Sequence, residues 1–434
     1  MIKTKNIATT FGMRVLIVNT SEHTGGAAIA AARLREALGN NGIKATMLVS
    51  RKESEAITVA EPRDTGRMKY NFLRERFTIW KANGFRKHRL FEVDAANFGI
   101  DITGMKDFEE ADIIHLHWIN QGFLSLKGIA KILRSGKPVV WTLHDMWAFT
   151  GICHYNGDCE RYKDCCGKCP VLYGGGFSRD LSRRVFMRKR KLYSNANITF
   201  VACSDWLAKC ASSSALLEGK RVLSIPNPIN TRLYRPLNMA KARESLALPL
   251  GRKLLLFAAY RVTNKIKGID YLCESIRILA DEHPDLASNI AVVAVGKESD
   301  ALKELLPVKV YSLGYVANEK KMIDIYNACN VFMIPTMQDN LPNTIMESMA
   351  CGVPCVAFNV GGIPQMIDHK TNGYVAEYKN AKDFTEGIMW CLAPENADSL
   401  GEKTRNKVNS TFSETAVARR YSDLYNSLSG SKND

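Results

Sequence analysis

The sequence predicts an α/β protein built from two doubly wound, Rossmann-like domains. Three observations carry this prediction. Short apolar runs alternate with helical stretches through most of the chain, which is typical of β-α-β units in a parallel sheet. The alternation is interrupted at 224–229, where two prolines flank an asparagine, a pattern that suits a linker. The length of 434 residues also fits two large domains.

The first series of elements predicts an N-terminal domain over 13–225. Residues 1–12 precede the first strand-like run and are expected to form a loose arm. An alanine-rich stretch followed by Gly39 predicts a helix at 27–38, and a second helix is predicted at 124–133. The apolar runs that predict buried strands are 14–19, 45–49, 112–117, 138–143 and 198–202.

The second series follows a linker at 226–230 and predicts a C-terminal domain over 231–410. Its helix at 268–279 follows the first of its apolar runs, and an amphipathic helix at 413–428 lies in the final segment, 411–434. The predicted strands are 253–259, 290–295, 308–313, 331–334 and 354–358. Because open parallel sheets bind ligands at the carboxyl ends of their strands, the two domains are expected to face a common cleft with those ends.

The composition excludes several protein classes. A hydrophobic fraction of 46% with 24% charged residues is ordinary for a globular enzyme and argues against a disordered chain or a coiled coil. No apolar run approaches the roughly 18–20 residues that a membrane-spanning helix needs. The first six residues lack the apolar core of a secretory signal, and the scattered cysteines fit a reducing cytoplasm.

Positive charge is concentrated in the N-terminal half. The first 225 residues hold 35 Lys and Arg against 21 Asp and Glu, whereas the rest hold 24 against 23. Two stretches, 63–89 and 179–191, carry nine and seven of these cations with aromatic residues between them. Such stretches suit an anionic membrane surface or an acidic substrate, although a plain solvated face would have the same composition. No nucleic-acid-binding module accompanies the charge, so no nucleic-acid partner is expected.

Polar groups follow three of the predicted N-terminal strands. Gly26 ends a loop, NTSEHTGG, in which glycines allow a ligand to approach the backbone at the start of a helix. His115 and His117 lie two apart on one strand and therefore on one face, and His144 ends the next strand. These side chains are either structural, hydrogen-bonded histidines or members of a ligand site.

Five of the twelve cysteines fall in the insert at 151–176. The spacing of Cys166 and Cys169 around a glycine is that of a metal-binding knuckle, and Cys153 and Cys159 would complete four thiolates. A structural zinc is therefore one interpretation of the insert. Free thiols or a disulfide remain the other, because the spacing is irregular.

The C-terminal domain carries the residues that suggest phosphate and sugar chemistry. Arg261 and Lys267 follow one strand, where two cations can clamp a diphosphate. Asp339 lies in a loop, and Glu347 lies on a helix that begins near Asn343. A carboxylate one turn into a helix can accept both vicinal hydroxyls of a ribose, while the backbone N–H groups of Asn340 and Leu341 can bind phosphate or sugar oxygens.

These motifs resemble the retaining glycosyltransferases of family 4, which have the GT-B fold. The segment LPNTIMESMACGVP, the acidic pair eight residues apart, the Arg261 to Lys267-Gly268 spacing and the segments NTSEHTGG, IIHLHW, WTLHDMW and IPNPI match in order from about Met13 onward. The stretch from His144 to Pro170 is similar to a subgroup found in capsule, exopolysaccharide and colanic-acid biosynthesis. The usual first acid of the family is Glu, and Asp339 is one methylene shorter.

The resemblance implies a cytoplasmic bacterial enzyme at the inner face of the membrane that transfers a hexosyl group without a catalytic metal. It would move the sugar of a UDP- or GDP-sugar to a glycan or lipid-diphosphate-linked acceptor, with the last helix crossing back to the N-terminal domain. The resemblance assigns donor binding to Gly26, Arg261, Lys267, Asp339, Asn340, Leu341 and Glu347. It places His117 and His144 on the acceptor side. The residues that it implies are catalytic are His144, Arg261, Lys267 and Asp339. The alternatives are a non-catalytic nucleotide-sugar-binding scaffold or another nucleotide-sugar enzyme on this fold. A dehydrogenase is disfavoured because the first turn lacks G-x-G-x-x-G.

Overall fold

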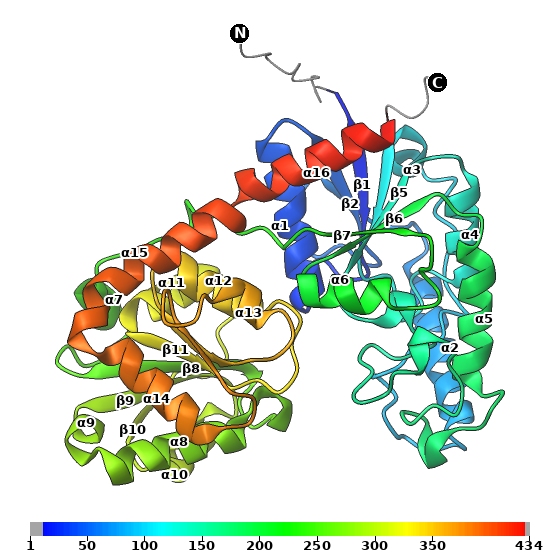
Figure 1. Cartoon of the computed structure of the whole chain (residues 1–434). Coiled ribbons are helices and arrows are strands. Elements are labelled where there is room, and N and C mark those ends of the chain that lie inside the picture. Colours follow the sequence, from blue (N-terminus) through cyan, green and yellow to red (C-terminus); the bar gives the residue numbers. More distant parts are fainter. Residues whose placement is uncertain (1–11, 430–434) are drawn as a thin grey trace. The chain divides into compact units, whose positions relative to one another are not determined.

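The computed structural model describes residues 12–429, in two compact units (Figure 1). The N-terminal unit comprises the described residues up to Pro228 together with those from Val417 onward, and the C-terminal unit comprises Ile229–Ala416. The loose arm expected before Met13 lies outside the described residues, apart from Gly12. No helix in the range 12–429 is long and apolar enough to cross a membrane.

The N-terminal unit is built on a seven-stranded, parallel sheet in the order β3-β2-β1-β4-β5-β6-β7. Its order reverses between β1 and β4, which is the switch point of a doubly wound sheet. The strands are β1 (Arg14–Val18), β2 (Lys44–Leu48), β3 (Val59–Ala60), β4 (Ile113–Leu116), β5 (Val139–Leu143), β6 (Ile198–Ala202) and β7 (Arg221–Ser224). The helices are α1 (Gly26–Asn40), α2 (Thr65–Ala82), α3 (Lys106–Glu110), α4 (Leu126–Arg134), α5 (Leu181–Tyr193) and α6 (Asp205–Ser212).

Both faces of this sheet are covered. On one face Val15 and Ile17 of β1 pack with α1 and with the last helix, α16 (Glu414–Ser429), through Val417, Tyr421 and Tyr425. On the other face the core includes residues of α2, α4 and α5. Figure 1 shows α1 and α5 on opposite sides of the sheet. The alternation of side chains along each strand therefore supplies both cores.

The C-terminal unit has a six-stranded, parallel sheet in the order β10-β9-β8-β11-β12-β13. Its strands are β8 (Lys253–Arg261), β9 (Ile290–Lys297), β10 (Lys309–Ser312), β11 (Val331–Ile334), β12 (Cys355–Phe358) and β13 (Tyr374–Ala376). Its helices are α7 (Met239–Ser245), α8 (Ile269–Glu282), α9 (Pro284–Ser288), α10 (Leu302–Leu305), α11 (Glu319–Ala328), α12 (Asn343–Ala350), α13 (Ile363–Met366), α14 (Ala381–Leu392) and α15 (Pro394–Thr411).

The predicted α/β fold class is confirmed, and the structure adds helices that were not predicted. The two basic stretches are largely helical, as α2 and α5, and each begins at an aspartate: Asp64 and Asp180 accept hydrogen bonds from N–H groups of the first turn. Two of the cations assigned to these stretches are not on the surface. Arg76 is buried against Asp94 at 2.7 Å, and Lys189 is buried completely.

Candidate functional site

In the C-terminal unit two loops at the carboxyl ends of β8 and β11 are packed tightly together. The N–H of Met337 donates to the carbonyl of Ile266 at 2.8 Å, and a Cβ at Gly268 would lie 1.8 Å from the carbonyl oxygen of Pro335. Only glycine fits there. This packing brings Lys267 to Asp339, whose carboxylate lies 2.8 Å from the Lys267 ammonium. Both side chains keep solvent access, at 36% and 18% exposure.

The Asp339 loop rests in turn on the loop after β12. The N–H of Gly362 donates to the carbonyl of Asn340 at 2.8 Å, and a Cβ at Gly361 would lie 1.8 Å from the Asp339 carbonyl oxygen. Asn340 and Leu341 are buried by this packing. Three loops therefore fix the position of Asp339.

A methyl group at Gly361 is expected to displace the Asp339 loop. Gly361→Ala should lower the Tm more than Gly314→Ala, because both glycines have positive φ, at 59° and 66°, but a Cβ at Gly314 meets no atom within 4 Å. Thermal unfolding of the two variants separates backbone strain, about 1 kcal/mol in each, from the clash. Equal Tm values would mean that the Asp339 loop yields at no cost.

Glu347 lies one turn into α12, as predicted, and is 8% exposed. Its Oε2 accepts a hydrogen bond from the hydroxyl of Tyr326 on α11 at 2.7 Å. Burial and the neighbouring Glu347 carboxylate raise the pKa of Tyr326 well above its usual value, so this hydroxyl stays a donor. The helix dipole of α12 favours an anion at its N-terminus, and no acidic residue lies in the first turn. Glu347 follows one turn later.

Arg261 is placed differently from Lys267. Its guanidinium forms a 3.2 Å ion pair with Glu298, which follows β9, and Thr263 also donates to the Glu298 carboxylate. The register between β8 and β9 shifts between Ala258 and Arg261. The two cations therefore belong to separate ion pairs, and their joint action on one diphosphate stays a prediction.

An exposed aromatic pair beside Arg261 was not predicted from the sequence. The rings of Tyr260 and Tyr315 are 64% and 54% exposed and their centroids are 5.5 Å apart. The Lys297 ammonium lies 2.6 Å from the Tyr260 hydroxyl and 4.4 Å from the centre of its ring. Flat exposed rings next to a cation can stack a planar, electron-rich group such as a base. The sequence signals this pair by position, because Tyr260 directly precedes Arg261 and Tyr315 directly follows Gly314.

In the N-terminal unit three histidines form a row at the ends of β4 and β5, with His115 and His117 buried and His144 partly buried. His117 Nδ1 lies 2.9 Å from His144 Nε2, and the rings of His115 and His117 are 4.4 Å apart. Burial lowers the pKa of His115 to about 3 and that of His144 to about 4, and it lowers the pKa of His117 well below its usual value. All three rings are therefore neutral at physiological pH.

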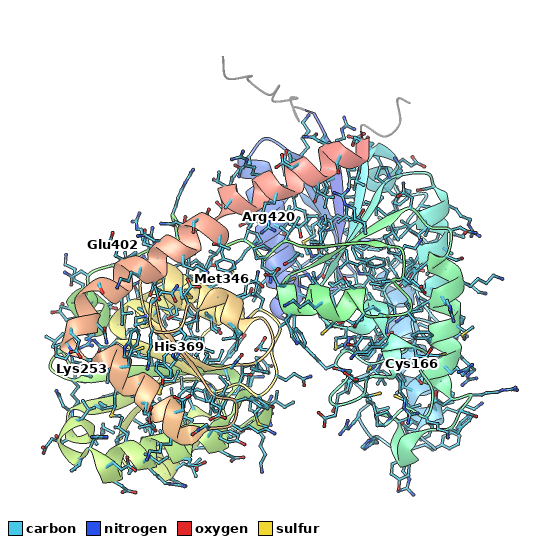
Figure 2. The ribbon with its side chains drawn as sticks, viewed as in Figure 1. Cys166, Lys253, Met346, His369, Glu402 and Arg420 are labelled. Carbon is cyan, nitrogen blue, oxygen red and sulfur yellow. The ribbon has the colours of Figure 1, made fainter. Side chains whose placement is uncertain are left out.

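The last helix holds this row in place. His115 Nδ1 and Nε2 lie 2.7 Å from the hydroxyls of Tyr425 and Thr142, and Thr142 is also 2.9 Å from the Tyr421 hydroxyl. Figure 2 labels Arg420 on the same helix, which donates to the carbonyl of Ser224. Both ring nitrogens of His115 are thus used, which supports the structural interpretation for that residue.

A histidine–aspartate pair, His154 with Asp145, lies next to this row and was not predicted. His154 Nδ1 lies 2.7 Å from the carboxylate of Asp145, which also accepts from the indole of Trp118 at 2.9 Å. Burial disfavours the charged form of His154, but the Asp145 carboxylate outweighs that effect and raises the pKa of the imidazole. Only the adjacency of Asp145 to His144 could have drawn attention to it.

Gly26 is the first residue of α1, one residue before the predicted start of that helix, and the loop before it is anchored by a buried carboxylate. Glu22 accepts hydrogen bonds from the N–H groups of Glu53 and Ser54 at 2.6 and 3.1 Å. Gly25 has a φ of 93° with open space beside it, and the first turn of α1 contains no acid. The loop can therefore admit an anionic or sugar group at the N-terminus of α1.

In the structure the cysteines of the insert are free thiols, which was one of the two interpretations left open by the sequence. Cys153, Cys159, Cys166 and Cys169 line one cavity of about 20 Å³ at the start of α5, where Figure 2 labels Cys166. However, in the described part of the chain no three His, Cys, Asp or Glu side chains are grouped to hold a metal ion. Burial raises the pKa of Cys153 and Cys166 to about 12, and both thiols are free.

A buried lysine is hydrogen-bonded to the backbone just before and at the start of this loop. The Lys189 ammonium donates to the carbonyls of Trp147, Thr150 and Gly151 at 2.5, 3.1 and 3.2 Å, and it lies 3.4 Å from the centre of the Trp147 ring. Burial lowers its pKa to about 7. Three carbonyls and an aromatic face compensate its charge in part.

Comparison with known proteins assigns a glycosyltransferase domain to each unit. Residues 24–233 match the family described as Glycosyltransferase Family 4, and residues 252–394 match the family described as Glycosyl transferases group 1. The first match ends beside the division between the units, and the second contains Lys267, Asp339 and Glu347.

Curated relatives are similar over part of their length. An uncharacterized glycosyltransferase of Haemophilus influenzae is 32% identical over 42% of this chain and 49% of its own. The putative colanic acid biosynthesis glycosyl transferase WcaC of Escherichia coli is 24% identical over 61% and 64%. An N,N'-diacetylbacillosaminyl-diphospho-undecaprenol alpha-1,3-N-acetylgalactosaminyltransferase of Campylobacter jejuni is 23% identical over 58% and 66%. The matches thus span about half to two thirds of these relatives.

Two solved structures show the same fold. A glycosyltransferase from Rickettsia africae has a TM-score of 0.65 at 16% identity, with 97% of this chain and 99% of that chain covered. HepE of Anabaena, solved in complex with UDP-glucose, has a TM-score of 0.61 at 15% identity, with 96% and 100% covered. With its two parallel-sheet units and its two matching domains, the chain belongs to the glycosyltransferases of the GT-B type, with a family 4 domain followed by a group 1 domain.

Proposed function

We propose that this protein transfers a sugar from a UDP- or GDP-sugar to a glycan acceptor, with retention of configuration at the anomeric carbon. The observation that carries the proposal is the arrangement in the C-terminal unit. A lysine–aspartate pair, partly exposed to solvent, is fixed by three loops in the same unit as Glu347, a buried carboxylate one turn into α12. A nucleoside diphosphate sugar needs a cation for its phosphates, an acceptor for its ribose hydroxyls and a polar group for its sugar.

In the proposed reaction the bond between the anomeric carbon and the diphosphate oxygen breaks, and a bond to the acceptor oxygen forms on the same face of the sugar. The acceptor hydroxyl gives its proton to the departing phosphate. Negative charge grows on the diphosphate, where Lys267, with Arg261 and the N–H groups of Asn340 and Leu341, would stabilise it. These chain groups supply the positive charge, so the proposal needs no catalytic metal.

The other residues take roles around the sugar. Asp339 would hold a sugar hydroxyl and Glu347 the ribose. Gly26 would let the donor approach the start of α1. His117 and His144, both neutral, would hydrogen-bond the reacting sugar and the acceptor without adding charge.

The acceptor that we propose is a lipid-linked glycan of a bacterial surface polysaccharide, such as a capsule or an exopolysaccharide. The name of the Campylobacter jejuni relative specifies a diphospho-undecaprenol acceptor, and that of the Escherichia coli relative specifies colanic acid biosynthesis. A lipid-linked acceptor would place the enzyme on the cytoplasmic face of the membrane, and the basic N-terminal half supports that location.

The donor half of this proposal is tested by nucleotide binding. UDP, GDP and their sugar conjugates are screened by thermal shift, since a ligand that binds only the folded protein raises the Tm. Glu347→Gln keeps an acceptor for the Tyr326 hydroxyl. It should lower the affinity for the nucleotide roughly 10- to 100-fold, because the ribose hydroxyls lose a charged acceptor.

The matched control is a second tyrosine–glutamate pair in the same unit. Tyr234 donates to Glu319 at 2.8 Å, so Glu319→Gln makes the same chemical change on α11 and should leave nucleotide affinity unchanged. If no nucleotide shifts the Tm of the folded protein, the transferase proposal fails. If Glu347→Gln binds as tightly as the parent protein, the ribose role is wrong.

A further inference from the structure

The outer face of α2 is apolar along its centre. Tyr70, Leu73 and Phe77 are 59%, 56% and 56% exposed. Their spacing of three and four residues places them on one side of the helix, while Met68 and Ile79 face the core. Three large apolar side chains in a row on a solvent-facing helix are unusual, because isolated exposed side chains are the rule.

The apolar row continues past the end of the helix. The ring centres of Phe77 and Trp80 are 5.7 Å apart, and those of Trp80 and Phe85 are 4.8 Å apart. Phe85 is 57% exposed and has a positive φ of 61°. Tyr173 joins the same end of α2, since its N–H donates to the side-chain oxygen of Asn83, which caps the helix. We call Tyr70, Leu73, Phe77, Trp80, Phe85 and Tyr173 the α2 surface.

Cations border the α2 surface. Between positions 63 and 91 the exposed charged side chains are one acid, Asp64, which caps the helix, and eight cations. Arg74 and Arg86 lie over the rings of Tyr70 and Tyr173, with 5.3 and 4.2 Å to the ring centres. The eight cations are Arg63, Arg67, Lys69, Arg74, Lys81, Arg86, Lys87 and Arg89.

Helix α5 extends the basic border. Arg188 of α5 donates to Asn97, whose N–H donates to Glu75 of α2 at 3.0 Å, so the two helices are linked (Figure 1). The exposed cations of this second stretch are Arg179, Arg183, Arg184, Arg188, Arg190 and Lys191. Positive charge therefore predominates along α2 and on the neighbouring helix α5.

We infer that the α2 surface docks on an anionic phospholipid membrane and inserts its aromatic side chains at the level of the headgroups. An apolar row bordered by Lys and Arg matches an interface in which acyl chains lie below anionic headgroups, and Tyr and Trp are enriched at that depth. A second copy of the chain fits less well, because like charges would meet across the contact. The biological sense of the inference rests on the proposed lipid-linked acceptor.

Vesicle sedimentation tests the inference without any transfer assay. The full chain is mixed with vesicles of phosphatidylcholine alone or of equal amounts of phosphatidylcholine and phosphatidylglycerol. We expect binding to the anionic vesicles, falling with added salt. Leu73→Asp with Phe77→Asp should lower the vesicle partition coefficient at least tenfold, since each change removes an inserting side chain and adds a like charge to the lipid. Arg67, Lys69 and Lys81 changed together to Gln should lower the partition coefficient on the order of 100-fold.

Matched variants in the C-terminal unit serve as controls. Leu250→Asp with Leu305→Asp changes two exposed leucines, and Lys309, Lys320 and Lys321 changed to Gln remove three exposed cations. Both should bind vesicles as the parent does. Nucleotide thermal shift on each variant confirms the fold and keeps the donor site separate from the membrane result. Equal vesicle binding by parent and α2 variants overturns the inference, as does α2-dependent self-association without vesicle binding.

Discussion

Replacement of Lys267 by methionine is expected to lower kcat for sugar transfer by about 100- to 1000-fold. The ammonium lies 2.8 Å from Asp339 and is 36% exposed, so it can reach a bound diphosphate. Charge on the leaving group is larger in the transition state than in the ground state, and a preorganised cation is therefore worth more in the reaction than in binding. Nucleotide affinity should fall by a smaller factor. Steady-state kinetics with the donor found by thermal shift would measure both.

The same unit offers a matched control for this prediction. Lys407 pairs with Asp368 at 2.9 Å and is 24% exposed, and nothing places that pair among the site loops. Lys407→Met should leave kcat within about twofold of the parent. If Lys267→Met and Lys407→Met have equal rates, the leaving diphosphate is stabilised by other groups, and the ion pair with Asp339 is structural.

Much of the fold and part of the site were predictable because local patterns decide them. Strands β4, β5 and β6 are buried and apolar except for one polar residue each, since both faces of the sheet are covered. Glu347 was predictable one turn into α12 because a proline and an asparagine mark the start of that helix. The contact between Lys267 and Asp339 is not a local property. It depends on Gly268 and Gly361, which pack closely against the backbone of Pro335 and Asp339, and the sequence does not show which segments meet there.

The sequence did not reveal which charged residues are buried. In the sequence Lys189 and Arg76 look like the surface cations around them. In the structure Lys189 donates to three carbonyls, and Arg76 pairs with Asp94. The cysteine spacing suggested four ligands around one ion, but spacing does not determine where the thiols point. Conversely, Tyr70 and Leu73 look like core residues by composition, and only the packing of α2 shows that they face solvent.

The histidine row is expected to make the N-terminal unit sensitive to mild acid. The unfolded chain binds protons at a histidine pKa of about 6.5, whereas the pKa of His115 is lowered to about 3 and that of His144 to about 4. A depressed pKa means that the folded state binds fewer protons than the unfolded state between these values. The free energy of unfolding therefore falls as the pH falls through 6.5. Each of these two histidines should cost about 2 kcal/mol between pH 7 and pH 5, and His117 adds to the loss.

His154 works against this loss, because its raised pKa favours proton binding by the folded state. The two effects can be separated by urea unfolding at several pH values, followed by tryptophan fluorescence, since five of the six tryptophans lie in the N-terminal unit. His115→Gln should reduce the dependence on pH by about one proton, and His154→Gln should steepen it. Tyr425→Phe, which removes a hydrogen bond and leaves every histidine, should lower stability by about 1 kcal/mol at each pH without changing that dependence. A flat profile in the parent protein would mean that the row takes up protons without unfolding, and the proposed uncharged contacts of His117 and His144 with the substrates would then fail below neutral pH.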